Sequence, residues 1–455
     1  MPMVPEHDIA ILGAGFSGSL LATLLAQHRG PDRLLLVERG AEAGPGTAYG
    51  TSDPAHLLNV PAKAMSAFPD APAHFLDWAR QRPAAEFGPL CDGAAPDAFL
   101  PRALYGTYLR GVLSESGVAP RRAEVTAVTR DGDGWVLGTA AGPIARVRTV
   151  VLATGNPPPS GTGDAHLRGD PWAPGALDGI PAEAPVLLVG TGLTMVDTVM
   201  SLRLSRGHRG PIHAISRHGW LPLAHPPAPL PWPRGYDLPQ PGAGPRAVLR
   251  AVRTEVAAAV AEGAPWQTVI DALRPVTQAL WRAWPEAEQA RFLRHLRTLW
   301  NLHRHRVAPR AKAVLRQAVA EGQLRLRAAR LLGHDPAGEG TIARLRLRGG
   351  AEDALPVARI LLCTGPGSGA SSREEWLQAP PLRQLRAEGL LATDAFALGI
   401  DCDPEALQVL DAAGRPVPGL HLLGPIMRGR LWESTAVPEL RAQAARLAER
   451  LATAP

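Results

Sequence analysis

The chain of 455 residues has few cysteines and no long apolar run. Its three cysteines, Cys91, Cys363 and Cys402, include no C-x-x-C pair. This usage is typical of a reducing compartment and argues against a flavin–disulfide reductase. No uninterrupted run of about 18 apolar residues occurs, so we expect no transmembrane helix. Residues 1–8 lack a basic region followed by an apolar one, so we expect no signal peptide and a cytoplasmic protein.

Lysine is almost absent, although the formal net charge is +6. Lys63 and Lys312 are the two lysines, and arginine supplies the rest of the positive charge. The abundance of alanine, glycine and proline indicates the codon bias of a GC-rich genome, and arginine also suits phosphate and carboxylate ligands. No nucleic-acid-binding motif is recognisable, so we expect neither nucleic acid nor a membrane as the main partner.

A first glycine fingerprint follows the apolar residues 9–12, which predict a buried strand. The sequence then turns sharply and opens a helix, which places backbone N–H groups and a helix N-terminus against a pyrophosphate. The residues expected to hold the cofactor in this turn are Gly13, Gly15, Phe16, Ser17 and Gly18.

The second predicted strand, residues 33–38, ends in Glu38, and Arg39 follows it. A carboxylate at this position hydrogen-bonds ribose hydroxyls and would repel a 2′-phosphate, so the unit suits the ADP portion of FAD. The alternative is an isolated glycine-rich turn with a surface glutamate. Because strand, turn, helix, strand and acid all occur in order, we favour FAD and include both Glu38 and Arg39 among its expected contacts.

A second fingerprint begins after the predicted strand at residues 186–189. Its third glycine is replaced by Met195, and its second strand, residues 212–216, is followed by Arg217. An arginine there can bind a 2′-phosphate through charge-assisted hydrogen bonds, so we expect NADPH rather than NADH. A solvated surface arginine is the competing interpretation. The other expected contacts are Gly190, Gly192 and Thr194.

Two further apolar strands end in Thr-Gly, and a third late strand ends in glycine. The two Thr-Gly segments mark the expected crossovers between the domains. The late strand leads to an amphipathic helix ending near Leu451, whose N-terminus favours negative charge. The expected cofactor contacts in these segments are Thr154, Gly155, Gly365 and Gly424.

The order of these units predicts an α/β protein with two Rossmann-like dinucleotide-binding domains. We expect residues 1–180 to form the first part of the FAD domain and residues 351–455 its C-terminal part. Residues 181–350 are expected to form the NAD(P)H domain, with a helical insertion at about 245–320.

The insertion is expected to contain helices at residues 248–261, 266–284 and 286–303. The proline-rich segment 221–245 is long for a loop, which suggests a lid or a pocket wall. The motif at residues 303–306, His-Arg-His-Arg, has no nearby cysteine or carboxylate pair, so we expect no metal site. It fits a polar helix end that docks on the flavin domain, or an anionic substrate pocket.

Residues 57–70 have no clean period and predict an ordered loop with apolar anchors. The loop could lie over the flavin ring or pack between domains.

Together the motifs resemble a bacterial family of FAD/NAD(P)-binding proteins that includes FAD-dependent urate hydroxylase and nitrosuccinate-forming L-aspartate N-monooxygenase. The resemblance covers nearly the whole chain. The segments that carry it are residues 13–18, 57–62, 65–70, 190–197, 291–297, 303–306, 363–366 and 432–439.

This resemblance implies a single-component monooxygenase in which NADPH reduces FAD and a C4a-(hydro)peroxyflavin transfers oxygen to a small polar substrate. It implies catalytic positions at Asn59, Lys63, Met65 and Ser66, and further flavin contacts at Trp432, Glu433 and Thr435. Urate is the first expected substrate and aspartate or another amino acid the second. A flavin oxidase or dehydrogenase and a non-catalytic FAD-binding redox sensor are the alternatives.

Overall fold

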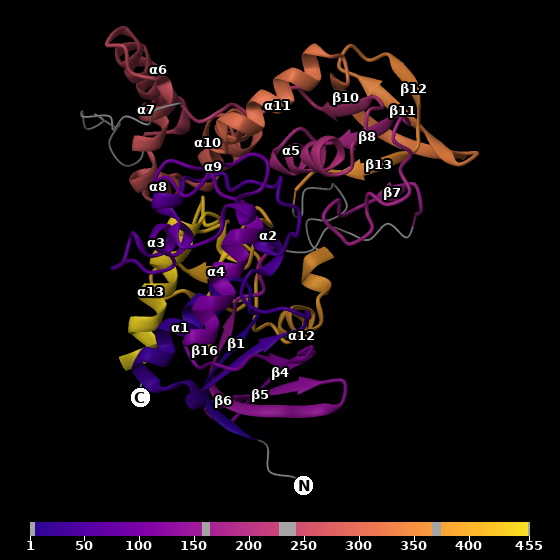
Figure 1. Cartoon of the computed structure of the whole chain (residues 1–455). Coiled ribbons are helices and arrows are strands. Elements are labelled where there is room, and N and C mark those ends of the chain that lie inside the picture. The colour runs from indigo at the N-terminus through magenta and orange to yellow at the C-terminus, as the bar shows by residue number, and fades with distance from the viewer. Residues whose placement is uncertain (1–4, 157–163, 227–242, 366–374, 454–455) are drawn as a thin grey trace.

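The computed structural model describes residues 5–156, 164–226, 243–365 and 375–453. Figure 1 shows three bodies: a first sheet with its helices, a second sheet above it to the right, and a group of helices above it to the left. The predicted lid lies mostly outside the described residues, as do the prolines at 157–159 that follow the first Thr-Gly.

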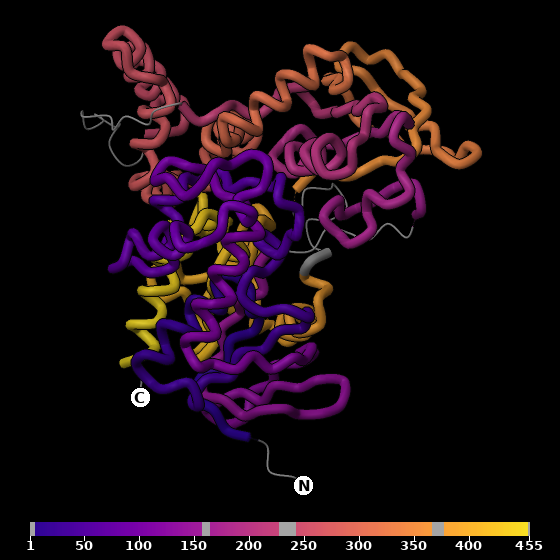
Figure 2. Tube along the Cα trace, in the orientation of Figure 1, coloured from indigo at the N-terminus to yellow at the C-terminus, as the bar shows by residue number. Residues whose placement is uncertain are grey.

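The first sheet joins strands from both ends of the chain. Within the described residues it has nine strands, in the order β14-β15-β16-β6-β1-β2-β3, with the β4–β5 hairpin beside β6. Figure 2 shows the N-terminal and C-terminal segments running through this one body. The strands are β1 Glu6–Leu12, β2 Leu34–Glu38, β3 Arg121–Arg122, β4 Ala127–Asp131, β5 Gly134–Thr139, β6 Gly142–Leu152, β14 Cys402–Asp403, β15 Gln408–Leu410 and β16 Pro416–Leu422.

Strands β16, β6, β1 and β2 are parallel, and residues 9–12 of β1 are buried. A parallel sheet has both faces covered, which explains why this strand is continuously apolar. Helix α1 packs against α4 and α13. The helices of this body are α1 Phe16–Arg29, α2 Gly46–Tyr49, α3 His74–Arg80, α4 Arg102–Glu115, α12 Pro380–Ala387 and α13 Val437–Thr453, with 3₁₀ turns η1 Pro31–Arg33, η2 Ala62–Ala64, η3 Ala84–Phe87, η6 Glu375–Gln378 and η7 Pro425–Met427.

The second sheet contains the second fingerprint. Its order over the described part of the chain is β12-β11-β10-β9-β8-β13-β7, with β7, β13, β8, β9 and β10 parallel. The strands are β7 Leu167–Arg168, β8 Val186–Val189, β9 Ile212–Ser216, β10 Leu324–Ala337, β11 Gly340–Leu347, β12 Glu352–Val357 and β13 Arg359–Leu362. Helix α5, Leu193–Met200, continues as the π-helical turn η4, Ser201–Ser205.

The second sheet extends beyond the expected boundaries at 180 and 350. Strand β7 precedes residue 180, while β12 and β13 follow residue 350. A two-residue edge strand carries no periodic signal, and β12 contains Pro356, which is tolerated at a sheet edge. Helix α11, Pro309–Ala320, packs on α5 and provides the crossover from β9 to β10, so it belongs to the nucleotide-binding unit and not to the insertion.

The insertion has more breaks than the sequence predicts. It comprises α6 Pro245–Ala261, α7 Trp266–Ala272, the 3₁₀ turn η5 Arg274–Val276, α8 Thr277–Ala283, α9 Glu286–His295 and α10 Arg297–Arg304. The expected helix at 266–284 is interrupted around Pro275, which lacks a backbone N–H and cannot continue a helix freely. The expected helix at 286–303 is interrupted at Leu296, where no proline or glycine marks the break.

Candidate cofactor sites and cavities

The first glycine turn fits a pyrophosphate. Gly13 has φ +102°, and a Cβ there would lie 2.5 Å from the carbonyl oxygen of Ala153. A Cβ at Gly18 would lie 1.9 Å from the carbonyl oxygen of Gly13. Both positions therefore require glycine, because the backbones of β1, β6 and α1 meet there. No side chain caps the first turn of α1, and that turn has no acidic residue, so its backbone N–H groups and dipole favour an anion.

Two segments far away in the sequence complete this turn. A Cβ at Gly15 would lie 3.3 Å from the Cα of Gly46, the first residue of α2. A Cβ at Gly424 would lie 3.1 Å from Ser17 Oγ, so the late glycine lies against the first fingerprint, as expected of a shared cofactor site. Phe16 is buried against Tyr49. The approach of Gly46 could not be predicted from the glycine fingerprint, because Gly46 lies outside it.

Glu38 extends from the end of β2 toward the same turn. Its Oε2 accepts a hydrogen bond from the Ala14 N–H at 2.7 Å, and its Oε1 accepts one from the Gly40 N–H at 2.8 Å. A carboxylate oxygen accepts more than one hydrogen bond, so capacity for ribose hydroxyls remains. Arg39 is exposed beside it.

The second glycine turn has the same construction. Gly190 has φ +115°, and a Cβ there would lie 2.2 Å from the carbonyl oxygen of Cys363. Gly192 is exposed and precedes α5, which has no side-chain cap and no acid in its first turn. Thr194 lies in that first turn and is half-buried. The turn therefore also fits a pyrophosphate.

The end of β9 is basic, in contrast to the end of β2. Arg217 is exposed and donates a hydrogen bond to Thr298 Oγ1 at 3.2 Å. The imidazole of His218 stacks on the exposed indole of Trp220, with ring centroids 4.4 Å apart. Partial burial lowers the pKa of His218, and the positive charges of Arg348 and Arg217 lower it further. Arg348 adds a second cation, which the local sequence around Arg217 does not indicate because Arg348 lies far from it along the chain.

Both Thr-Gly segments begin next to a glycine turn. The Cα of Thr154 lies 3.2 Å from the position of a Cβ at Gly13, and the backbone nitrogen of Thr364 lies 3.2 Å from a Cβ at Gly190. Gly155 and Gly365 have φ of +72° and +78°. Each crossover between the two bodies therefore starts beside a predicted nucleotide site.

The ordered loop at 57–70 contacts the second body. The carbonyl oxygen of Asn59 lies 3.0 Å from His225 Nε2, and burial is the main cause that lowers the pKa of His225 to about 4. Met65 is buried, and Lys63 forms an exposed ion pair with Asp97 at 2.6 Å. Ser66 Oγ donates to the carbonyl oxygen of Ala71 at 2.7 Å. The contact between Asn59 and His225 favours the domain-packing interpretation of the loop, whereas the contacts of Lys63 and Ser66 lie within the first body.

The late motif packs against the helical insertion. The indole of Trp432 stacks on that of Trp281, with centroids 4.9 Å apart. Glu433, at φ +68°, accepts a hydrogen bond from Trp300 Nε1 at 2.7 Å and lies 3.3 Å from His305 Nε2 and 3.5 Å from Arg304 Nε.

Burial alone would raise the pKa of Glu433, but the charges of His305 and Arg304 and the hydrogen bonds lower it to about 2. His305 and Arg304 belong to the motif at 303–306, so this motif docks the insertion, as one of its two interpretations predicts. Thr435 is exposed. Our expectation that Trp432, Glu433 and Thr435 contact the flavin remains a prediction.

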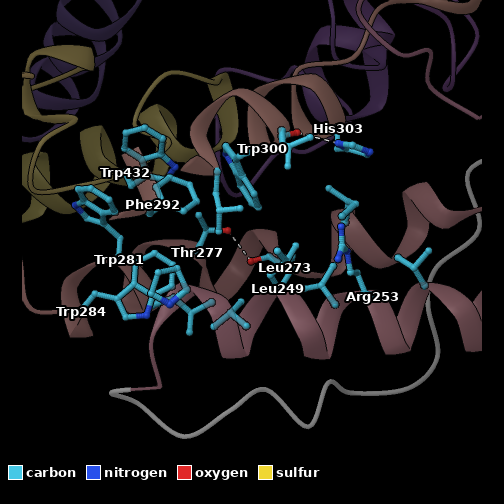
Figure 3. Close-up of a pocket in the computed structure, with 18 of the residues that line it drawn as sticks. Leu249, Arg253, Leu273, Thr277, Trp281, Trp284, Phe292, Trp300, His303 and Trp432 are labelled. Atoms are coloured by element: carbon cyan, nitrogen blue, oxygen red, sulfur yellow. Dashed lines mark hydrogen bonds between the residues drawn. The ribbon is translucent and has the colours of Figure 1, made fainter. Parts of the chain in front are cut away.

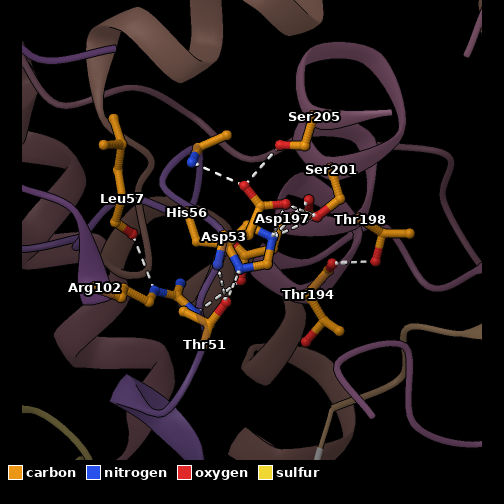
Figure 4. Close-up of polar contacts among 11 residues, drawn as sticks. Thr51, Asp53, His56, Leu57, Arg102, Thr194, Asp197, Thr198, Ser201 and Ser205 are labelled. Atoms are coloured by element: carbon orange, nitrogen blue, oxygen red, sulfur yellow. Dashed lines mark hydrogen bonds and ion pairs between the residues drawn. The ribbon is translucent and has the colours of Figure 1, made fainter. Parts of the chain in front are cut away.

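A buried polar network joins the two nucleotide-binding bodies (Figure 4). Arg102 Nη1 pairs with Asp197 Oδ2 of α5 at 2.7 Å, and Arg102 Nε donates to the carbonyl oxygen of Leu57 at 3.0 Å. His56 Nε2 lies 2.8 Å from Ser201 Oγ, which donates to Asp53 Oδ2 at 2.5 Å. Burial raises the pKa of Asp197, against the opposing charge of Arg102.

One indication of this network is visible in the sequence, since Asp197 is a carboxylate among the apolar residues of α5. Its partners could not be read, because Arg102 and His56 lie about a hundred residues or more away.

Two cavities border the insertion. One, of about 410 Å³, lies among its helices and is lined mainly by aromatic and aliphatic side chains (Figure 3). The other, of about 480 Å³, lies between the insertion and α13, and its wall includes the charged side chains of Arg274, Arg304, Glu433 and Glu439. In the described part of the chain, no group of three or more His, Cys, Asp or Glu residues could hold a metal ion. Among the same residues, no helix combines the length and apolar character needed to span a membrane.

Residues 10–157 match a family model described as FAD-NAD(P)-binding. This match covers the first fingerprint, Glu38 and the first Thr-Gly, and it supports the predicted FAD and NAD(P) cofactors. No curated protein matches the chain.

Solved structures match nearly the whole chain. The ornithine N-hydroxylase of Kutzneria sp. 744, solved with reduced FAD, NADP⁺ and L-ornithine, is 16% identical with a TM-score of 0.64, covering 98% of this chain and 99% of that one. An L-lysine 6-monooxygenase from Pseudomonas syringae is 16% identical with a TM-score of 0.63, covering 98% and 100%. The ornithine hydroxylase of Pseudomonas aeruginosa is 16% identical with a TM-score of 0.61, covering 98% and 99%. The predicted two-dinucleotide flavoprotein fold is confirmed.

Proposed function

We propose that this chain is an NADPH-dependent FAD monooxygenase. The observation that carries the proposal is the pair of glycine turns with opposite charge at the end of the following strand, Glu38 in one and Arg217 in the other. A carboxylate suits the ribose of FAD, and an arginine suits the 2′-phosphate of NADPH. The fold shared with flavin-dependent hydroxylases over the whole chain supports the same assignment.

When bound, FAD supplies the redox chemistry, in which electrons from NADPH serve the activation of O₂. The protein contributes the positioning. The N-termini of α1 and α5 would bind the two pyrophosphates, Glu38 would accept hydrogen bonds from a ribose, and Arg217 with Arg348 would bind the 2′-phosphate. The buried pair of Arg102 and Asp197 would hold the second body in a fixed place against the first.

We favour the nitrogen of an amino acid as the site of hydroxylation, because the ornithine and lysine hydroxylases share this architecture. Urate is the second candidate. It is supported by the resemblance of residues 65–70 and 432–439 to the family that includes urate hydroxylase.

The test is anaerobic mixing of the flavin-loaded protein with NADPH or NADH, followed by aeration with ornithine, lysine, aspartate or urate. We expect bleaching of the oxidised flavin, faster with NADPH, and a hydroxylated product detected by mass spectrometry. A flavin that stays oxidised would contradict the proposal. Peroxide formed without a nicotinamide cofactor would instead identify an oxidase, and bound FAD without stimulated NADPH consumption would favour a redox sensor.

A further inference from the structure

The aromatic cavity of the insertion has a wall whose polar atoms are mostly occupied. Trp281 Nε1 donates to the carbonyl oxygen of Gly429 at 2.8 Å, and Trp284 Nε1 donates to that of Ala243 at 2.8 Å. Trp300 Nε1 donates to Glu433 at 2.7 Å. The indole rings therefore present carbon surface to the cavity and require no hydrogen bond from a ligand.

Two observations indicate that this space takes a ligand. Its volume of about 410 Å³ lies in the range of small-molecule pockets, about 300–1,000 Å³, which are likewise mostly apolar with few polar groups. The indole N–H of Trp432, another wall residue, is buried and has no acceptor among the described residues. Unfilled, the cavity would forfeit the dispersion contacts of its aromatic walls.

One end of the cavity is polar and basic. Figure 3 shows Arg253 and His303 on the side away from Trp281 and Trp284. His303 Nδ1 donates to the carbonyl oxygen of Leu299 at 2.8 Å, so Arg253 is the group that we expect to pair with an anion at this end. Arg253 is exposed and makes no ion pair or side-chain hydrogen bond within the part of the chain that the structure describes.

We propose that this cavity binds a small aromatic or aliphatic molecule with an anionic head group. The apolar body lies among Trp281, Trp284 and Phe292, and the anion pairs with Arg253. The wall of this ligand site contains no residue of the two glycine turns and shares Trp432 with the predicted flavin contacts. The proposal does not depend on which substrate the flavin oxidises. Because Trp432 belongs to the C-terminal part of the first body, the ligand would contact that body and the insertion together.

The test is calorimetric titration of the flavin-loaded full chain with naphthaleneacetate and its neutral analogue naphthaleneacetamide. We expect the acid to bind more tightly than the amide. Leu249→Trp places a larger side chain in the wall and should abolish binding of both probes. Because Leu249 lies in the insertion, the rate of flavin reduction by NADPH should stay unchanged.

Arg253→Gln should weaken binding of the acid about tenfold and leave binding of the amide unchanged. Arg250→Gln is the matched control, because Arg250 is exposed on the same helix and does not line the cavity. Equal affinity for acid and amide, or an equal loss in the Arg250 variant, would overturn the anionic head group. Absence of binding by either probe, or full binding to a correctly folded Leu249→Trp variant, would overturn the site itself.

Discussion

The two nucleotide-binding bodies share their backbone plan and differ in what surrounds it. In each, a buried parallel strand leads into a glycine with φ above +100°, and the neighbouring strand ends in Thr-Gly beside that glycine. They differ at the end of the second strand, where one has Glu38 and the other Arg217. The comparison teaches that one local fold can occur with opposite charge at the end of its second strand, and the assignment of the two nucleotides that we propose depends on this charge.

The packing of the first helix also differs. A Cβ at Gly18 would overlap the turn, whereas the equivalent Met195 is fully buried with Val186 and Leu188 of β8. At α1, close backbone contact leaves no space for a side chain at this position. At α5, the side chain of Met195 therefore occupies the space between the helix and its sheet. The space between α5 and its sheet accommodates the side chain of Met195, so this departure from the fingerprint does not remove the glycine turn.

The largest expected effects come from the paired variants Gly13→Ala and Gly190→Ala. Each adds a Cβ that collides with a carbonyl oxygen in a positive-φ turn. Gly13→Ala should yield protein without flavin, while Gly190→Ala should keep its flavin but lose reduction by NADPH. Flavin absorbance per chain and anaerobic reduction rates measure the two outcomes.

Gly30→Ala is the control for this pair, because Gly30 also has a positive φ, +81°, but nothing lies within 4 Å of its Cβ position. This variant should keep both its flavin and its reduction by NADPH. Loss of flavin from both fingerprint variants alike would show that the two turns do not serve separate nucleotides.

Asp197→Asn tests the ion pair through which α5 contacts the first body. Helix α1 belongs to that body, so it needs no equivalent contact. It leaves the buried Arg102 guanidinium without its counter-charge, so the free energy of unfolding should fall by about 3–5 kcal/mol. Urea denaturation measures the change. Glu321→Gln, which removes an exposed partner of Arg203, should have no measurable effect. A variant as stable as the parent would mean that burial already keeps Asp197 protonated.

Glu433→Gln tests how the insertion, which lies between β9 and β10 of the second body in the sequence, docks on the first body. Because the pKa of Glu433 is lowered from 4.5 to about 2, its ionised form stabilises the fold above pH 4.5, and this contribution is lost as the pH falls toward 2. The variant should be about 3 kcal/mol less stable at neutral pH, with the difference shrinking below pH 4.5.

Urea denaturation across that pH range measures this difference. Glu449→Gln, an exposed change on α13, is the control and should show no such pH dependence. A difference that does not change with pH would contradict the ion-pair role of Glu433.

The smallest expected effect tests most directly the difference in charge between the two nucleotide-binding bodies. Arg217→Glu gives the second site the charge of the first, so the KM for NADPH should rise about tenfold while that for NADH changes little. Steady-state oxidation of the two cofactors measures the ratio. Arg246→Glu makes the same charge change on an exposed position of α6 and should not alter it. An equal rise for both cofactors would assign Arg217 another role.

Local features were predictable because each depends on adjacent residues. Both fingerprints, the buried strands that precede them and the final helix follow from apolar runs, glycine spacing and helical periodicity. The basic end of β9 could also be predicted, since Arg217 directly follows a recognisable strand. Short or edge strands such as β7 and β12 could not, because neither has a periodic apolar face long enough to detect.

The candidate site could be predicted only where residues close together in the sequence form it. Gly13 and Glu38 are linked by one βαβ unit, so their approach follows from the motif. The residues placed by resemblance, such as Ser66 and Glu433, instead make contacts set by distant elements: Ser66 is tied to Arg441 of α13 through its carbonyl oxygen, and Glu433 to the insertion.

The sequence alone determined that this protein has two turns for dinucleotides, in order and with opposite charges, because a strand–glycine–helix unit is specified by a few consecutive residues. Only the tertiary structure decided how the two units meet. The pairing of Arg102 with Asp197, the Trp281–Trp432 stack and the cavity behind it join segments separated by about a hundred residues or more. Contacts of that kind depend on how whole elements pack, which no short stretch of sequence specifies.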